Sequence, residues 1–184
     1  MNIYLSLIIV YIISIGLTPK KYKWYLPTIP IYPNNEEEAH MVEDMVIKRS
    51  SYDVDFFKKT DQSVSYVFSK IVPESKEEIG KMITNNNIYI PLMFFKYLIN
   101  RPRPKQILPE LNILHSNTSD TPAYPAGHAY QAYYLAKVFG KKYPYLKHQL
   151  DNLAYQCDIT RVKAGIHYPS DGRFAKQLVD SFYS

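Results

Sequence analysis

Along most of the chain, apolar residues recur every three or four positions, a spacing that places them on one side of a helix. Polar and turn-forming residues separate these stretches, and no strand pair, internal repeat or glycine-rich nucleotide loop can be recognised. The pattern predicts these helices: one beginning at Asn35, one carrying Val64, Val67, Phe68 and Ile71, one after the capping-box sequence Ser75-x-x-Glu78, and segments 88–100, 126–140, 144–157 and 170–182. We therefore expect an all-α protein.

Two neighbouring segments of this pattern differ sharply in composition. Segment 88–100 is apolar on both sides, so we expect a buried helix, which must end near Arg101 because Pro102 and Pro104 follow. Segment 105–124 is rich in Asn, Ser, Thr and Pro and is expected to form a long loop. A loop of this length in a compact domain is usually functional.

The N-terminal region is an apolar run over residues 3–17, followed by Lys20, Lys21 and Lys23. The run is short of the about 20 residues that cross a bilayer, but its length suits a signal peptide. Ser14 and Gly16 offer a small-x-small cleavage site, whereas positive charge after the run favours an uncleaved anchor, so both readings stay open. The predicted organisation is a signal peptide or membrane anchor at 1–18, a proline-rich linker at 19–34 and a single domain at 35–184, which carries the motifs described below. We expect a membrane-associated or secreted (lumenal) protein.

Composition adds little to the predicted domain organisation and partners. A chain of 184 residues that is 46% hydrophobic can build one domain with a substantial core. A net charge of +5 fits an anionic substrate and an anionic membrane surface equally well. Cys157 is the only cysteine, so no intramolecular disulfide can form, and its place on an apolar helical face predicts a packing role. Glu36, Glu37 and Glu38 fall in a first helical turn, where they are fully accounted for by the helix dipole.

Three groups of cationic or imidazole residues follow one another in the second half of the chain. In the first, Lys96 lies in an apolar helix, where an ammonium needs an anionic partner such as a phosphate oxygen unless it reaches solvent at the helix edge. Arg103, seven positions later, can hold two phosphate oxygens at once, and the flanking prolines keep its backbone extended.

The second and third groups add the residues that could react. Gly127 permits close approach of a ligand to the backbone, and His128 falls in the first turn of a predicted helix, where backbone amides bind anions. In the third group Arg161 can supply another planar clamp, and His167 is followed one helical turn later by Asp171. That spacing lets the carboxylate hold one ring nitrogen of the histidine while the other attacks phosphorus.

Together, Lys96-x6-Arg103-Pro104, Pro125-Ala-Gly127-His128 and Arg161-x5-His167-x3-Asp171 resemble the three motifs of the type-2 phosphatidic acid phosphatase and vanadium haloperoxidase superfamily. The resemblance covers 96–171 and implies a compact helical bundle of the acid phosphatase type. No segment after the N-terminal run is long and apolar enough to cross a membrane, which separates the chain from the polytopic lipid-phosphatase branch. Two positions depart from the family pattern, because Ala126 and Thr160 stand where serines are usual.

The resemblance also implies a role for each residue in a metal-independent phosphatase. His167 becomes phosphorylated, Asp171 orients it, and His128 first protonates the leaving group and later activates water. The residues expected to bind phosphate and stabilise the transition state are Lys96, Arg103, Gly127 and Arg161. Arg101 precedes a proline as Arg103 does, but only Arg103 has the motif spacing, so we expect Arg101 to serve the rim as an exposed charge.

Three rival interpretations use the same residues. A metal site made of His128, His167 and Asp171 conflicts with the three cations that would repel a divalent ion. A vanadium haloperoxidase would hold vanadate as a cofactor in the phosphate site. However, Ala126 lacks the hydroxyl with which the usual serine would donate to the oxyanion, and no halide-binding site can be recognised in the sequence. A module that only binds phosphate headgroups would not need the histidines and Asp171.

The expected cofactor is therefore none, with vanadate acting as an inhibitor. The expected partner is a phosphorylated small molecule or a lipid phosphate, with membrane association through the N-terminus and no nucleic acid. The sequence leaves the substrate open among lipid phosphates, isoprenoid diphosphates, nucleotides and small phosphomonoesters.

Overall fold

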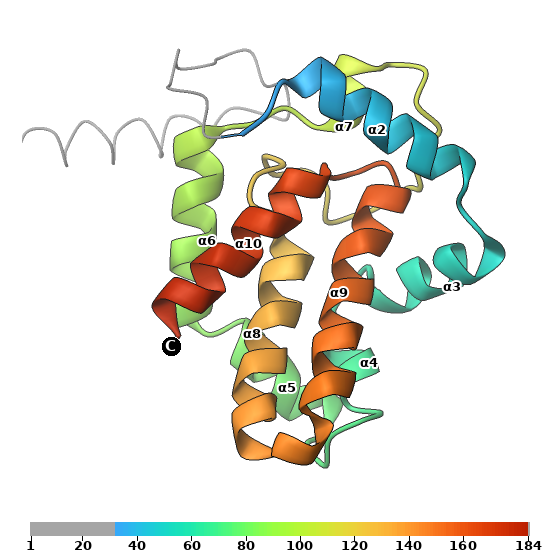
Figure 1. Ribbon diagram of the computed structural model, residues 1–184. Helices are drawn as coiled ribbons and strands as arrows, with labels where there is room; N and C mark the ends of the chain where they lie inside the picture. Colours follow the sequence, from blue (N-terminus) through green and yellow to red (C-terminus); the bar gives the residue numbers. More distant parts are fainter. Residues whose placement is uncertain (1–31, 184) are drawn as a thin grey trace, which may run out of the picture.

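The computed structural model describes residues 32–183, and in this part of the chain all regular structure is helical (Figure 1). The elements are α2 (Asn35–Ile47), α3 (Ser51–Thr60), α4 (Ser65–Phe68), α5 (Lys76–Ile83), α6 (Asn86–Ile99), α7 (Pro104–Ile107), α8 (Gly127–Lys142), the 3-10 turn η1 (Pro144–Leu146), α9 (Lys147–Lys163) and α10 (Pro169–Phe182). The all-α class predicted from the sequence is confirmed. Residues 1–18 and most of the proposed linker lie outside the described residues.

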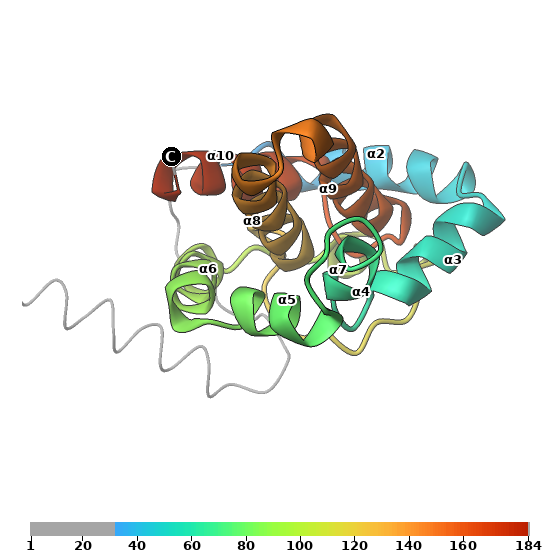
Figure 2. The same cartoon turned by 90° about the horizontal axis from the view of Figure 1, so that it is seen from below.

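The centre of the fold is the antiparallel pair α8 and α9, which η1 joins at one end (Figure 1). Figure 2 shows α6 and α3 on opposite sides of this pair. Apolar side chains of α8 and α9 pack with those of α4 and α5 in the largest buried cluster, which includes Phe68, Ile79, Leu135, Phe139, Leu150 and Cys157. Cys157 is fully buried there, as its spacing predicted.

Several helices begin at side chains that accept backbone N–H groups. Asn34 accepts from the amides of Glu36 and Glu37 at the start of α2, and Ser75 forms the predicted capping box with Glu78 at the start of α5. An equivalent box between Ser50 and Asp53 begins α3, a helix that the apolar pattern does not predict.

Three helix boundaries differ from the expected ones. The helix expected to carry Val64, Val67, Phe68 and Ile71 is the short α4, which has only four residues. Gly140 does not end α8, which continues to Lys142; a Cβ at Gly140 would lie 3.4 Å from the Lys147 side chain, so this glycine serves the close approach of the two chain segments. α9 continues six residues beyond Cys157, because its last turns are buried and carry Arg161 into the interior.

The expectation that segment 88–100 is a buried helix is wrong in part. α6 ends where predicted, with Asn100 in a left-handed conformation at its C-terminus, and its inner face is buried. However, three large residues of α6, namely Tyr89, Ile90 and Phe94, are exposed, and Ile90 on the outer face is 60% exposed. Among residues 32–183 no helix is long and apolar enough to span a bilayer.

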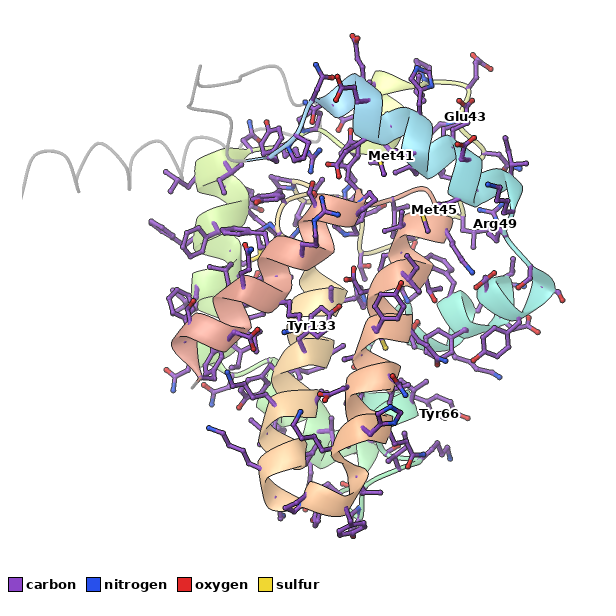
Figure 3. The ribbon with its side chains drawn as sticks, in the orientation of Figure 1. Met41, Glu43, Met45, Arg49, Tyr66 and Tyr133 are labelled. Atoms are coloured by element: carbon purple, nitrogen blue, oxygen red, sulfur yellow. The ribbon has the colours of Figure 1, made fainter. Side chains whose placement is uncertain are left out.

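The end of the molecule opposite η1 gathers the residues of interest. The end of α6, the start of α8, the end of α9 and the start of α10 meet there, and α2 and α7 lie across them (Figure 1). Arg49, labelled in Figure 3, follows α2 and donates to the carbonyl oxygens of Asn112 and Lys163, 3.2 Å away in both cases. It thereby fastens α2 to the long loop and to the end of α9.

Candidate active site

His167 and Asp171 form a buried pair at the start of α10. His167 lies in the short connection between α9 and α10, and Asp171 occupies the first turn of α10. His167 Nδ1 and Asp171 Oδ2 are 2.9 Å apart, and the same carboxylate oxygen accepts the backbone N–H of Tyr168 at 2.9 Å. Both side chains are almost fully buried. This is the contact that the spacing of the third motif predicts.

Arg103 approaches the other edge of the His167 ring. Its Nη1 lies 3.2 Å from His167 Nε2 and donates to the carbonyl of Ile166 at 2.7 Å, while its Nε donates to the carbonyl of Thr121 at 2.9 Å. Because a guanidinium can only donate, Nε2 faces it as an acceptor, and Nδ1 keeps the ring proton and donates it in a hydrogen bond to the Asp171 carboxylate. The neighbours therefore select the neutral tautomer whose Nε2 carries a free electron pair.

Lys96 and Gly127 bring the first and second motifs together. Lys96 is buried on the inner face of α6 and donates to the carbonyl of Pro122 in the long loop. A Cβ on Gly127, the first residue of α8, would lie 3.7 Å from Lys96 Cε. Ala126 precedes this helix and offers no side-chain cap, so the first amides of α8 receive no side-chain acceptor from it.

Arg161 enters the same region from the last turn of α9. Its Nη2 donates to Thr60 Oγ1, and its Nη1 forms an ion pair with Asp61 Oδ1 at 3.2 Å. Its Nε is buried and has no hydrogen-bond partner among the described residues. A buried donor of a charged group without an acceptor is costly, and an anion bound beside it would satisfy this atom.

His128, in the first turn of α8, is held by the main chain of Asp61. Its Nε2 lies 2.8 Å from the Asp61 carbonyl oxygen, which can only accept, so Nε2 carries a proton. The carboxylate of Asp61 also accepts from Ser116 Oγ at 2.6 Å and thus fastens the long loop. Asp61 was not among the expected site residues, yet it contacts both Arg161 and His128.

His167 is buried and His128 is half-buried among positive charges, which favours the neutral form of both rings. Burial lowers the pKa of His167 well below its usual range, and Arg103, Lys96 and Arg161 lower it further. Burial likewise lowers the pKa of His128, with the next largest contribution from Arg161. Burial and then Arg103 lower the pKa of Lys96. A bound dianion would relieve this concentration of positive charge.

The expectation that Arg101 is an exposed rim charge is wrong. Its side chain is 0% exposed and donates to four side chains. The guanidinium carbon lies 3.8 Å from the ring centre of Tyr168 and 4.3 Å from that of Tyr32. Its N–H groups donate to side chains away from the His167 Nε2 edge, whereas Arg103 lies 3.2 Å from that nitrogen. The assignment of phosphate binding to Arg103 stays a prediction.

Glu38 corrects the interpretation of the acidic triplet. It is buried, and its Oε2 accepts from Arg101 Nη2 at 2.8 Å, so the helix dipole does not account for it fully. It also accepts the N–H and the hydroxyl of Ser170 at the start of α10. No local signal distinguishes Glu38 from Glu36 and Glu37, because its role depends on a partner 63 residues away.

These features define a compact helical protein in which one end gathers four buried cations around a histidine–carboxylate pair. Among solved structures it is similar to a transmembrane PAP2 type phosphatidylglycerolphosphate phosphatase from Bacillus subtilis. The TM-score is 0.55, the sequence identity is 15%, and the match covers 97% of this chain and 93% of that chain. The chain therefore has the helical fold of a PAP2 type phosphatase. No family model and no curated protein matches it. In residues 32–183, no group of three or more His, Cys, Asp or Glu side chains is placed to hold a metal ion.

Proposed function

We propose that the chain is a phosphoric monoester hydrolase that forms a covalent phosphohistidine on His167. The observation that carries this proposal is the placement of one buried imidazole between Asp171, 2.9 Å from Nδ1, and Arg103, 3.2 Å from Nε2. Such a ring is a nucleophile whose reactive nitrogen already faces a phosphate-binding cation.

In the first step, the Nε2 electron pair of His167 attacks phosphorus, an N–P bond forms, and the P–O bond to the leaving group breaks. His128 gives its proton to the departing oxygen, so the alcohol leaves neutral. The depressed pKa of His128 makes its protonated form a strong acid, and the negative charge of the bound phosphate favours that form. Asp171 stabilises the positive charge that develops on His167.

In the second step, His128 takes a proton from water, and the resulting hydroxide attacks phosphorus. The N–P bond breaks, its electrons return to Nε2, and inorganic phosphate leaves. Lys96, Arg103, the free Nε of Arg161 and the amide of Gly127 would bind the phosphoryl oxygens throughout. No step of this cycle uses a metal ion, and vanadate would bind as an inhibitor that resembles the transition state.

The test uses the full chain in detergent with a chromogenic aryl phosphate. We expect turnover that persists with a chelator and stops with vanadate, and a phosphorylated intermediate that is acid-labile and alkali-stable, as phosphoramidates are. The variant His167→Ala should lose the intermediate, whereas His128→Ala should retain it, because an aryl oxide needs little help to leave. Turnover that is lost with chelator and restored by a divalent metal would overturn the mechanism, and phosphate trapped on His128 would reverse the two roles.

A second candidate is hydrolysis of a lipid phosphate at a membrane. Two observations favour it: the similar solved structure is a phosphatidylglycerolphosphate phosphatase, and α6 exposes Ile90 and Phe94 on the side turned away from Lys96. An apolar, partly aromatic helix face is suited to the boundary between lipid headgroups and acyl chains. On this reading, one helix contacts lipid with its outer side and phosphate with its inner side.

Substrate comparison separates the two candidates. If the substrate is a lipid, Ile90→Glu and Phe94→Glu should lower the rate on phosphatidic acid in mixed micelles by about tenfold or more, because each buries a charge in the lipid contact. The same variants should hydrolyse the soluble aryl phosphate at the rate of the unmodified chain. If the variants hydrolyse both substrates as fast as the unmodified chain does, a soluble phosphate ester is the better assignment of the substrate.

A further inference from the structure

We propose that Arg101 and Glu38 are positioning residues for the nucleophile: Arg101 fixes the Asp171 carboxylate that orients His167, and Glu38 fixes Arg101. This inference rests on the proposed function, because it assigns His167 the role of nucleophile. The contacts form a continuous chain of charged side chains from α2 to the reactive histidine.

Arg101 makes contacts that leave it no role as a phosphate ligand. Its Nη1 donates to Asp171 Oδ1 at 2.7 Å and to Ser170 Oγ at 2.6 Å, and its Nε donates to Asn35 Oδ1 at 3.0 Å. Its Nη2 donates to Glu38 at 2.8 Å. The rings of Tyr168 and Tyr32 lie close to the guanidinium carbon. A group held in this way cannot turn toward substrate, and it presents one fixed edge to Asp171.

Asp171 divides its two oxygens between the nucleophile and this arginine. Oδ2 accepts from His167 Nδ1 and from the backbone of Tyr168, while Oδ1 accepts from Arg101. With Oδ1 held, the carboxylate cannot rotate, so the His167 ring keeps the plane in which Nε2 faces Arg103. Arg101 therefore acts on the reactive nitrogen through Asp171 without touching it.

Glu38 has two effects on this arrangement. It accepts from the N–H and the hydroxyl of Ser170, and so holds the first turn of α10 on which Asp171 lies. It also supplies a negative charge beside Arg101, which offsets part of the positive charge that Asp171 experiences. Removal of Glu38 and removal of Arg101 should therefore change the ionisation of Asp171 in opposite directions.

The direction of each change follows from the surroundings of Asp171. Burial raises the pKa of Asp171 to about 6, and Arg101 opposes this rise more than any other group. The charged or titratable groups that face this carboxyl are Lys96, Arg101, Arg103, Tyr124, Asp158 and His167. Without Arg101 the pKa of Asp171 rises further, so a larger fraction of Asp171 is protonated at neutral pH and His167 loses its anionic acceptor. Without the charge of Glu38 the pKa falls.

The experiment compares Arg101→Gln and Glu38→Gln in the full chain with the aryl phosphate. For Arg101→Gln we expect kcat to fall by about 100-fold, the upper scale for loss of a residue that orients a site ligand, with KM and vanadate inhibition changed less than about threefold. The acidic limb of kcat/KM, which reports the free enzyme, should move to higher pH. For Glu38→Gln, which keeps shape and acceptor oxygen, the same limb should move to lower pH.

A matched control is Arg173→Met. Arg173 also donates to Glu38, at 3.4 Å, but its side chain is 62% exposed. This variant should keep both kcat and the acidic limb. A merely structural role for the Arg101–Glu38 pair predicts lower activity in both glutamine variants without opposite pH shifts, and that result would overturn the proposal. Loss of vanadate inhibition in Arg101→Gln would also overturn it, because it would make Arg101 a phosphate ligand.

A spectroscopic readout keeps the inference separate from the proposed function. In the unmodified chain, nitrogen NMR of His167 should show a neutral ring protonated at Nδ1, and Arg101→Gln should populate the Nε2 tautomer. If the unmodified chain hydrolyses no phosphate ester, the proposed function fails while this measurement still tests the positioning. If Arg101→Gln does not fold, Glu38→Gln alone tests the proposal, through the expected shift of its acidic limb to lower pH. An unchanged acidic limb together with an unchanged His167 signal in Glu38→Gln would refute the positioning role.

Discussion

Arg161 and Asp61 form an ion pair 3.2 Å long between residues 100 positions apart in the chain. The carboxylate lies beside a cation that we assign to the phosphate, and it also accepts from Ser116 of the long loop. Asp61 therefore orients Arg161 before substrate binds, and it also places a negative charge near the incoming dianion. These two effects oppose each other, and one substitution can separate them.

The variant Asp61→Asn retains an oxygen that can accept from Arg161 and Ser116 but removes the charge. We expect vanadate to inhibit this variant more strongly by about fivefold, or about 1 kcal/mol, the scale of one partly exposed charge. The measurement is the vanadate inhibition constant at neutral pH. Asp55→Asn, an exposed change of equal charge on α3, serves as the control and should leave the constant unchanged. Weaker inhibition of Asp61→Asn would show that the charge mainly orients Arg161.

The parts of the fold that were predictable are those set by local sequence. The predicted start of α2 at Asn35, the capping box at Ser75 and the apolar spacing of α10 each depend on residues within a few positions of the feature they determine. The outer face of α6 was not predictable in this way, because the sequence reports that a residue is apolar and not what covers it. The helix α3 was missed because its apolar residues are few and are interrupted by charges.

In the candidate site, too, contacts between residues close in sequence were predictable, and contacts between distant residues were not. The His167–Asp171 contact joins positions four apart, which a helical turn brings together. The motif spacing assigned phosphate to Arg103 rather than Arg101, which stays a prediction; the structure places Arg103 beside His167. Glu38 and Asp61 were missed because their partners lie 63 and 100 positions away, and only packing of the helices creates those pairs. The expected exposure of Arg101 was wrong because its burial depends on α2 lying across the end of α6.

The two neighbouring arginines should respond differently to removal. Arg103→Ala should lose about 2 to 4 kcal/mol of transition-state stabilisation in kcat/KM, the scale for one charge-stabilising donor, and should weaken vanadate inhibition. Arg101→Ala should lose about 3 to 5 kcal/mol of folding stability, because it leaves Glu38 and Asp171 buried without their cation. Urea denaturation and inhibition constants, measured on both variants, check this division. Equal stability losses with equal inhibition constants would contradict it.

Asp158 should make folding stability depend on pH. It is buried between α8 and α10, accepts from Tyr133 at 2.9 Å (Tyr133 is labelled in Figure 3), and its Oδ1 has no partner among the described residues. Burial raises its pKa to about 7, well above the usual value near 4, so the folded state binds this proton more tightly than the unfolded state does. Its contribution is fully present below about pH 4 and is lost as the pH rises through about 7.

The corresponding variant is Asp158→Asn, which cannot ionise. Relative to the unmodified chain, it should gain a few kcal/mol of stability between pH 4 and pH 8, at about 1.4 kcal/mol for each unit of pKa shift. The measurement is the difference in free energy of unfolding between the two proteins across this range. A difference that does not change with pH would mean that Asp158 is already ionised in the folded state at low pH.

Gly172, one residue after Asp171, is where α10 touches Asp158 of α9. A Cβ at this position would overlap both carboxylate oxygens of Asp158, which Tyr133 holds in place. We expect Gly172→Ala to cost about 1 to 3 kcal/mol of stability, as overpacking does in a filled interior, and to lower kcat by displacing the turn that carries Asp171. Gly80→Ala, in α5 with open space around it, should instead gain up to about 1 kcal/mol. Urea denaturation and aryl phosphate turnover measure both effects. The double variant Gly172→Ala with Asp158→Ala should recover most of the lost activity, because it removes the obstructing carboxylate; a double variant as inactive as Gly172→Ala would show that the glycine is needed for a reason other than this contact.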